Sequence, residues 1–308
     1  MTPFPQRQVS PSDSRRRLRA LMGGPQPLEL PGPYDAASAQ VLAQIGFEAL
    51  WAGGKVSSQA RLGVPDVNLM TMTEQLEFCT SIVDATGLPI VADADDGYGQ
   101  ALMVTRTVQA FERAGVAAVV IEDQASPKHC AFYEGMTLEL ISRDQMVAKI
   151  KAAVDARTDE ALMIWARTDA LPALHSPAEA LDRAQACVEA GADAVFTPSS
   201  SLDDLATIGG GWDRPQPLVM SSSNFVRMPL ARVGEIGYGA RIHPREAILA
   251  ALRGVQLVYR ELFETGSFGE VAANSLPAAE LDALGGQSQA EALDARFRAI
   301  SEAPQAVG

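Results

Sequence analysis

Acidic residues follow three successive apolar runs of the sequence, each at the point where the run ends. They are Asp93, Asp95 and Asp96; Glu122 and Asp123; and Asp169, which follows Arg167 and Thr168. If the runs are strands, Asp93 and Asp95 share a face because side chains alternate. Several carboxylates in one place need a cation, and oxygen ligands without a His or Cys cluster favour Mg²⁺, with Mn²⁺ as an alternative. The set therefore predicts a metal site at Asp93, Asp95 and Glu122, although one such acid alone is more typical of a helix cap.

Lys128, His129 and Cys130 follow the second of these acidic groups within a few residues. This stretch could be a metal site, a nucleophilic thiol, a proton donor or an ordinary surface loop. Cys79 and Cys187 fall within helical patterns, which indicates core packing. Cys130 instead lies in a long polar loop, and loops of this length are often lids over a site. The loop is therefore a candidate for catalysis.

Other residues at the ends of apolar runs could bind an anion. Backbone N–H groups of Gly53 and Gly54 could hold a carboxylate or phosphate. Arg167 offers a bidentate fork for the same kind of group. His243 follows the last run, where a buried structural histidine and a catalytic one are equally expected. Together these residues predict a small anionic ligand.

All these candidates belong to one repeating unit, a short β-rich apolar run followed by a loop and an amphipathic helix. The predicted strands are 28–30, 49–53, 89–95, 117–123, 162–168, 194–198, 218–222 and 239–244, with helical patterns at 73–86, 101–115, 142–157 and 176–191. Eight such units indicate an α/β fold, a (β/α)₈ TIM barrel whose active site lies at the C-terminal ends of the strands. An open doubly wound sheet is the alternative, but no GxGxxG follows the first strand. We assign 1–265 to the barrel with a short N-terminal arm, and 266–308 to a C-terminal helical extension that packs on the barrel or on another subunit.

The composition excludes several classes of partner. Hydrophobic residues make up 47% of the 308 residues and charged residues 20%, as in globular proteins. A net charge of -13 argues against nucleic acid, and the one basic cluster, Arg15 to Arg17 with Arg19, is expected on the exposed face of an N-terminal helix. No apolar run approaches the ~20 residues that span a bilayer, so no membrane partner is expected. Three widely spaced cysteines and no signal-peptide core indicate the cytoplasm.

Four motifs carry a resemblance to a known family: LGVPD (62–66), VADADDGYG (91–99), IEDQ with the following PK and C (121–130), and ARTDA (166–170). From about residue 15 to 265 the chain resembles the isocitrate lyase/phosphoenolpyruvate mutase superfamily. The resemblance implies a barrel whose eighth helix is swapped between subunits, giving homodimers or homotetramers. It also implies Mg²⁺ and a mobile loop after the fourth strand that closes over a 2-oxo or 2-hydroxy carboxylic acid.

Matched motif by motif, the resemblance assigns roles to individual residues. Asp95 resembles the direct metal ligand, with Asp93, Glu122 and Asp66 in the surrounding shell. The predicted substrate-binding residues are Trp51, Gly53, Gly54, Asp66, Arg167 and His243, of which Trp51 and His243 resemble the mutase branch.

The loop that decides the chemistry departs from the lyase pattern. The lyases carry K-[KR]-C-G-H, whose Cys protonates the carbanion left by bond cleavage; here Cys130 is kept, but Ala131 and Phe132 replace Gly-His. Two further lyase motifs are replaced by Thr197-Pro198-Ser199 and by Val219-Met220-Ser221-Ser222. These losses argue against the tricarboxylate substrates, because a buried carboxylate without partners is costly. Phe132 and Tyr133 indicate a more apolar part of the substrate.

The resulting hypothesis is a Mg²⁺-dependent carbon–carbon lyase. It cleaves a 2-hydroxy or 2-oxo acid, releases a 2-oxo acid, and uses Cys130 as proton donor, tuned by Lys128 and His129. Arg167 binds the substrate carboxylate. The alternatives in the same superfamily are a phosphonopyruvate or phosphoenolpyruvate mutase or hydrolase, and an oxaloacetate decarboxylase. A barrel that binds a small acid without turnover is a third possibility.

Overall fold

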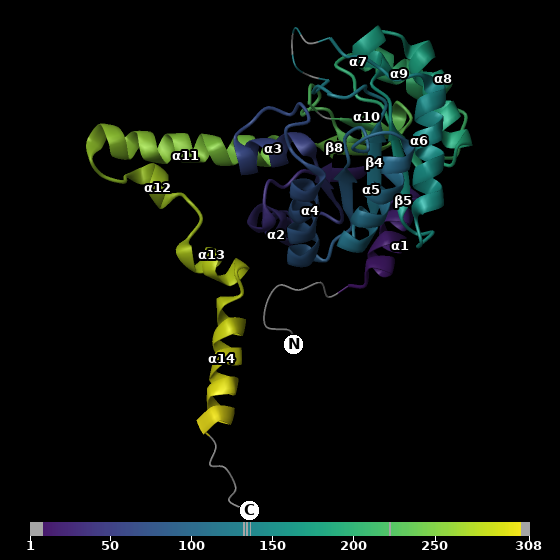
Figure 1. Cartoon of the computed structure of the whole chain (residues 1–308). Coiled ribbons are helices and arrows are strands. Elements are labelled where there is room, and N and C mark those ends of the chain that lie inside the picture. The colour runs from purple at the N-terminus through teal and green to yellow at the C-terminus, as the bar shows by residue number, and fades with distance from the viewer. Residues whose placement is uncertain (1–8, 132, 134, 136, 222, 303–308) are drawn as a thin grey trace, which may run out of the picture.

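Eight parallel strands form a nearly closed barrel (Figure 1). The structure, a computed structural model, describes residues 9–302 except 132, 134, 136 and 222. Its strands are β1 (Leu28–Pro31), β2 (Leu50–Ala52), β3 (Ile90–Asp93), β4 (Ala118–Glu122), β5 (Met163–Arg167), β6 (Ala194–Phe196), β7 (Leu218–Ser221) and β8 (Tyr238–His243). Hydrogen-bonded ladders run from β2 in order to β8 and on to β1, and β1 lies beside β2. The predicted TIM barrel is confirmed.

Helices surround the barrel and end where the sequence provides caps. They are α2 (Ala36–Ile45), α3 (Gly54–Leu62), α4 (Met72–Thr86), α5 (Ala101–Ala114), α6 (Arg143–Ala156), α7 (Ala170–Leu174), α8 (Pro177–Glu189), α9 (Leu202–Gly211) and α10 (Leu230–Glu235). Thr71 with Glu74, and Ser142 with Gln145, form capping boxes that begin α4 and α6. Gly87 and Gly115 end α4 and α5 in the left-handed conformation. The four predicted helical patterns correspond to α4, α5, α6 and α8.

The strands divide the core into an inner and an outer layer. Val91 and Trp165 pack inside the barrel, whereas their neighbours Ile90 and Ile164 pack outward against the helices. Because side chains alternate along a strand, each second residue toward the C-terminal end points inward again. This alternation brings the last residues of β3, β4 and β5 into the mouth of the barrel.

Helix α1 (Pro11–Met22) closes the other end of the barrel and corrects one expectation. Leu18 is fully buried against the inner core layer. Arg15 is only 5% exposed and donates hydrogen bonds to the carbonyls of Val116 and Glu112, with an ion pair to Asp159. Arg16 and Arg17 are exposed, as expected of this cluster, whereas Arg15 is buried and ties the helix to the barrel.

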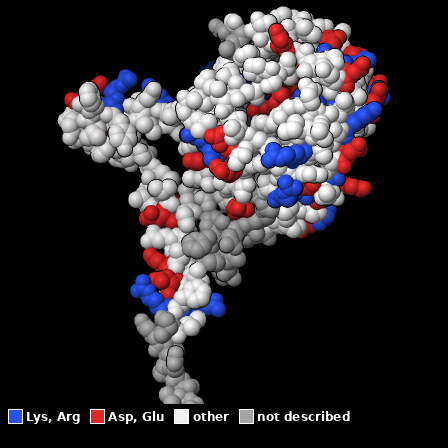
Figure 2. Space-filling model, viewed as in Figure 1, with Lys and Arg blue, Asp and Glu red and all other residues white. Residues whose placement is uncertain are grey.

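The C-terminal helices leave the barrel instead of covering it (Figure 1). They are α11 (Glu246–Thr265), α12 (Glu270–Ala273), α13 (Ala278–Leu284) and α14 (Gln287–Glu302), and α13 contacts α2. Ile248 of α11 is buried, whereas exposed apolar side chains include Leu249, Leu252, Val255, Tyr259 and Phe263. In Figure 2 the projecting helix α11 shows a broad uncharged surface with charged groups at its upper edge, and further charged groups gather along α14. Within the described residues no helix is long and apolar enough to cross a membrane.

Candidate active site

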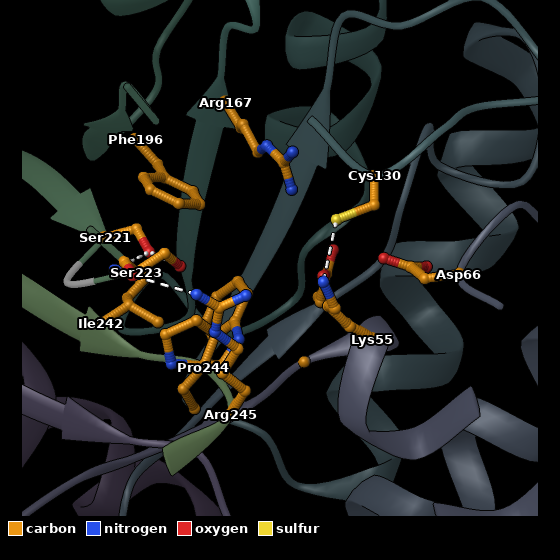
Figure 3. A pocket seen from close by; sticks show the side chains of 13 residues that line it. Lys55, Asp66, Cys130, Arg167, Phe196, Ser221, Ser223, Ile242, Pro244 and Arg245 are labelled. Carbon is orange, nitrogen blue, oxygen red and sulfur yellow. Dashed lines mark hydrogen bonds between the residues drawn. The ribbon is translucent and has the colours of Figure 1, made fainter. Parts of the chain in front are cut away.

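A cavity of about 530 Å³, part of it open to solvent, lies at the C-terminal ends of the strands (Figure 3). The predicted site residues that line it are Trp51, Gly53, Asp66, Asp93, Cys130 and Arg167. Lys55, Phe196, Ser221, Ser223, Ile242, Pro244 and Arg245 complete the lining. The structure thus brings residues from distant motifs to one place, as a TIM barrel requires of its active site.

Arg167 occupies the centre of this mouth because of its strand register. It pairs in register with Glu122 on β4 and Phe196 on β6, so all three side chains face inward. Asp169 accepts two hydrogen bonds from Arg167, from Nε and from Nη2, each 3.0 Å long. Nη1 lies 2.9 Å from Glu122 Oε2, and the guanidinium carbon lies 5.3 Å from the centre of the Phe196 ring. The guanidinium is therefore held in one orientation with N–H groups left for a ligand.

Lys128 contacts the acids rather than the thiol, which differs from its expected role. Its side chain is 2% exposed, and Nζ lies 2.5 Å from Asp66 Oδ1 and 2.8 Å from Asp95 Oδ1. Burial alone would lower the pKa of Lys128, but the carboxylates of Asp95 and Asp66 raise it well above its usual value. Lys128 is thus a buried cation within a cluster of buried acids, which we call the acidic cluster: Asp66, Asp93, Asp95, Glu122 and Asp169.

The acidic cluster holds more negative than positive groups. Burial, joined by the charges of Asp93 and Asp66, raises the pKa of Asp95 although Lys128 opposes the shift. Burial likewise raises the pKa of Glu122 well above its usual range, against the opposing effect of Arg167. Both Glu122 oxygens lack a well-aligned hydrogen bond within the described chain, Oε2 having the ion pair with Arg167. Five buried carboxylates, those of Asp66, Asp93, Asp95, Glu122 and Asp169, face two buried cations, Lys128 and Arg167, so the cluster has an excess of acidic groups that a divalent cation would help to balance.

The same acids fit Mg²⁺ in their chemistry. Their donors are all carboxylate oxygens, as a hard cation prefers. Among the described residues, no three His, Cys, Asp or Glu side chains lie close enough to form a ready-made ligand cluster. The metal site at Asp93, Asp95 and Glu122 therefore stays a prediction.

Cys130 points into the cavity beside a cation that the sequence reading missed (Figure 3). Its Sγ lies 3.7 Å from Nζ of Lys55, the second residue of α3. Lys55 Nζ also lies 4.6 Å from the centre of the Tyr133 ring, and the Tyr133 hydroxyl accepts a hydrogen bond from the Asp66 backbone. Lys55 is therefore the ammonium next to the thiol. Phe132 lies outside the described residues.

The backbone at Gly53 and Gly54 approaches the acids closely. Gly54 N–H donates to Asp93 Oδ2 over 3.1 Å, and a Cβ at Gly54 would lie 3.0 Å from Asp95 Oδ1. In this structure that N–H group serves Asp93, while Gly53 lines the cavity. Trp51 packs edge-to-face on Phe196 with ring centres 6.1 Å apart. This segment forms one wall of the cavity.

The two predicted histidines lie elsewhere. His243 Nε2 lies 2.6 Å from Glu29 Oε2, and neither residue lines the cavity. His129 lines a separate depression behind the loop. The cavity position expected for His243 is taken by Pro244 and Arg245, and Arg245 donates a hydrogen bond of 3.0 Å to the Ser223 carbonyl. Arg245 carried no sequence signal beyond its place just after a predicted strand end.

Comparison with known proteins agrees with this geometry. The family model described as phosphoenolpyruvate phosphomutase matches residues 18–263. The chain is 39% identical over 250 residues to 2,3-dimethylmalate lyase of Eubacterium barkeri, covering 78% of this chain and 82% of the relative. It is 39% identical to 2-methylisocitrate lyase of Aeropyrum pernix, covering 77% and 76% of the two chains. It is 38% identical to oxaloacetate decarboxylase of Pseudomonas syringae pv. tomato, covering 82% and 86%.

Solved structures with the same fold come from the same group. Phosphoenolpyruvate phosphomutase from Streptomyces platensis subsp. rosaceus superimposes with a TM-score of 0.88 at 32% identity, covering 92% of this chain and 99% of the other. Phosphonopyruvate hydrolase in complex with oxalate and Mg²⁺ gives 0.85 at 29% identity, covering 94% and 99%. With these matches, the motifs and the barrel, the chain belongs to the isocitrate lyase/phosphoenolpyruvate mutase superfamily and is an enzyme of the lyase type.

Proposed function

We propose that the chain is a Mg²⁺-dependent carbon–carbon lyase that acts on a 2-hydroxy or 2-oxo acid and releases a 2-oxo acid. The observation that carries the proposal is that Cys130 and Arg167 line one cavity beside the acidic cluster. Asp95, Asp93 and Glu122 would hold the metal, which when bound supplies Lewis-acid stabilisation of charge on a substrate oxygen. Arg167 would bind the substrate carboxylate with its remaining N–H groups.

Cys130 is the proton donor in this proposal. When the carbon–carbon bond breaks, one carbon keeps the electron pair, and the thiol gives its proton to that carbon. The sulfur is then left as a thiolate. Lys55 Nζ, 3.7 Å away, is placed to stabilise that negative charge.

The far side of the cavity favours a substrate with a second acidic group. Arg245, Ser221 and Ser223 line it opposite the acidic cluster (Figure 3). An Arg side chain binds a carboxylate with charge-assisted hydrogen bonds, and serine hydroxyls can donate to the same group. The apolar rings of Trp51 and Phe196 also line the cavity. We therefore favour a diacid with an apolar part.

Replacement of the thiol tests the proposal. Cys130→Ser should abolish turnover of 2-hydroxy diacids but keep Mg²⁺-dependent binding of a 2-oxo acid, measured by calorimetry. Cys187→Ser is the matched control, because Cys187 is buried in α8 away from the cavity and burial raises its pKa to about 12. Unchanged turnover in Cys130→Ser would overturn the proton-donor role.

Decarboxylation of an oxaloacetate-like acid is the second candidate function. The identity to an oxaloacetate decarboxylase, 38%, is close to the 39% found for 2,3-dimethylmalate lyase. That reaction, like phosphorus–carbon chemistry on phosphonopyruvate, needs no protonating thiol from the loop. Release of CO₂ from oxaloacetate at equal rates by the wild type and Cys130→Ser would favour the decarboxylase.

We also propose that two or more copies assemble by exchange of α11. The helix that should cover the barrel projects from it, and its apolar residues are exposed, with Phe263 91% exposed. A second copy could cover such a face, since isolated apolar patches of this kind mark interfaces. Sedimentation velocity should give a dimer or tetramer; a monomer at micromolar concentration would contradict the exchange.

A further inference from the structure

Gln124 joins the loop after β4 to the base of the site. The proposed mechanism gives this residue no role. Its side chain is 1% exposed. Both ends of its amide bind the backbone of His129: Nε2 donates to the carbonyl and Oε1 accepts from the N–H, each at 2.9 Å. His129 lies between Lys128 and Cys130, so Gln124 fixes the segment that carries the buried cation and the thiol.

The same amide also binds Asp169. Gln124 Nε2 donates to Asp169 Oδ2, the oxygen that accepts the hydrogen bond from Arg167 Nη2. Asp169 is fully buried, and its own N–H donates to Asp123 Oδ1 over 2.9 Å, which fixes its backbone. A continuous chain of hydrogen bonds therefore runs from the loop through Gln124 and Asp169 to Arg167.

We propose that Gln124 is a positioning residue that couples the loop segment 128–130 to the orientation of Arg167. The inference builds on the proposed function, in which Arg167 binds the substrate carboxylate. If His129 moves away from Gln124, the Gln124 amide loses two hydrogen bonds and can turn away from Asp169. Asp169 then loses one hydrogen-bond donor, and the geometry of its two hydrogen bonds with Arg167 changes. Conversely, a carboxylate that fixes Arg167 would favour the loop position seen here, because coupling of this kind is reciprocal.

A second anchor of the same loop provides a matched control. Asn68 lies in the segment before α4, and its side chain accepts a hydrogen bond from the Lys128 N–H. Within the part of the chain that the structure describes, Asn68 makes no hydrogen bond with Asp169 or Arg167. Asn68→Ala therefore loosens the loop without cutting the chain to Arg167, whereas Gln124→Met removes all three hydrogen bonds with little change in volume.

Alkylation of Cys130 by iodoacetamide in the ligand-free enzyme measures the loop position. Cys130 is 7% exposed, and Cys79 and Cys187 are buried in helices, so mass spectrometry can follow the one thiol. Gln124→Met should speed alkylation about tenfold, the effect of one to two lost hydrogen bonds. Asp169→Asn should also speed it although Asp169 does not touch the loop backbone, and the double variant should be no faster than Gln124→Met alone. Asn68→Ala should speed alkylation too, but its effect should add to that of Asp169→Asn.

Binding of oxalate with Mg²⁺, measured by calorimetry, separates this inference from the proposed function. Gln124→Met should weaken oxalate binding about tenfold and Asn68→Ala less than threefold, since only the first cuts the chain to Arg167. Additive alkylation effects of Gln124→Met and Asp169→Asn would overturn the coupling even if oxalate binds. Absence of oxalate binding to the wild type would overturn the carboxylate role of Arg167, while the alkylation cycle would still decide the coupling. If Gln124→Met does not fold, Gln124→Asn takes its place in the same cycle.

Discussion

Replacement of Lys128 by Met tests whether the acidic cluster is built for a divalent cation. Lys128 contributes two buried ion pairs, at 2.5 Å to Asp66 and 2.8 Å to Asp95. Removing one partner of a buried pair costs about 3–5 kcal/mol, because the other charge stays buried and uncompensated. In EDTA the variant should therefore melt about 6–10 °C below the wild type, at ~2 °C per kcal/mol for a chain of this size.

Mg²⁺ should reduce that difference. At a hundredfold excess over its Kd, a ligand stabilises the folded state by about 2.7 kcal/mol. Without Lys128, five buried carboxylates face Arg167 alone, so the cluster is more negative by one charge and should bind Mg²⁺ more tightly than in the wild type. The increase in Tm on adding Mg²⁺ should thus be larger in Lys128→Met, as measured by thermal unfolding at several Mg²⁺ concentrations.

Lys149→Met is the matched control for this experiment. Lys149 is also 2% exposed, but its Nζ donates to the carbonyl of Asp96 over 2.6 Å and does not line the cavity. Because Lys149 lies within electrostatic range of Glu122 but pairs with none of the acids of the cluster, its loss should lower Tm and change the response to Mg²⁺ less than Lys128→Met does. Equal Mg²⁺ responses of the wild type and Lys128→Met would refute the argument that Lys128 shares its acids with a metal.

Three further outcomes follow from other contacts. Arg15→Met should cost about 3–5 kcal/mol in urea unfolding, because it leaves buried partners unpaired, against about 0.5 kcal/mol or less for the exposed Arg16→Met; equal losses would contradict the docking of α1. Arg245→Met should raise KM about 10–100-fold for diacids and leave KM for monoacids nearly unchanged. An equal effect on both would contradict a second subsite that binds a carboxylate. Burial tends to raise the pKa of Glu29, but hydrogen bonds from His243 and Arg241 lower it to about 2. The resulting stability is present above pH 4.5 and lost as the pH falls toward 2, so the destabilisation caused by Glu29→Gln should shrink over that range in unfolding titrations.

The fold and the acidic half of the site could be predicted because they depend on local periodicity. Alternation along a strand places Asp93, Glu122 and Arg167 on the inner face once the strands are recognised. Parallel strands then bring these residues to one end of the barrel. Neither step requires knowledge of distant contacts.

The contacts between distant segments could not be predicted in this way. Lys55 meets Cys130 across 75 positions, and Arg15 meets the carbonyl of Val116 across 101. A lysine in a helix and a run of arginines both resemble solvated surface, since their buried partners are a thiol and backbone carbonyls that leave no pattern. Proximity in the sequence predicts that Lys128 acts on Cys130, whereas the fold turns the Lys128 side chain toward Asp66 and Asp95.

The position of Arg15 also has a consequence for the order in which the chain can fold during synthesis. Its acidic partner Asp159 lies 144 residues further on. At roughly 5–20 residues per second, a ribosome needs about 7–30 s to make that intervening segment. During this interval α1 has already been synthesised, with Leu18 and Met22 on its apolar side, but the end of the barrel that it packs against has not. Helix α1 is therefore synthesised early but packs in its native position late. In the meantime its apolar side is exposed to a chaperone that binds short apolar helices.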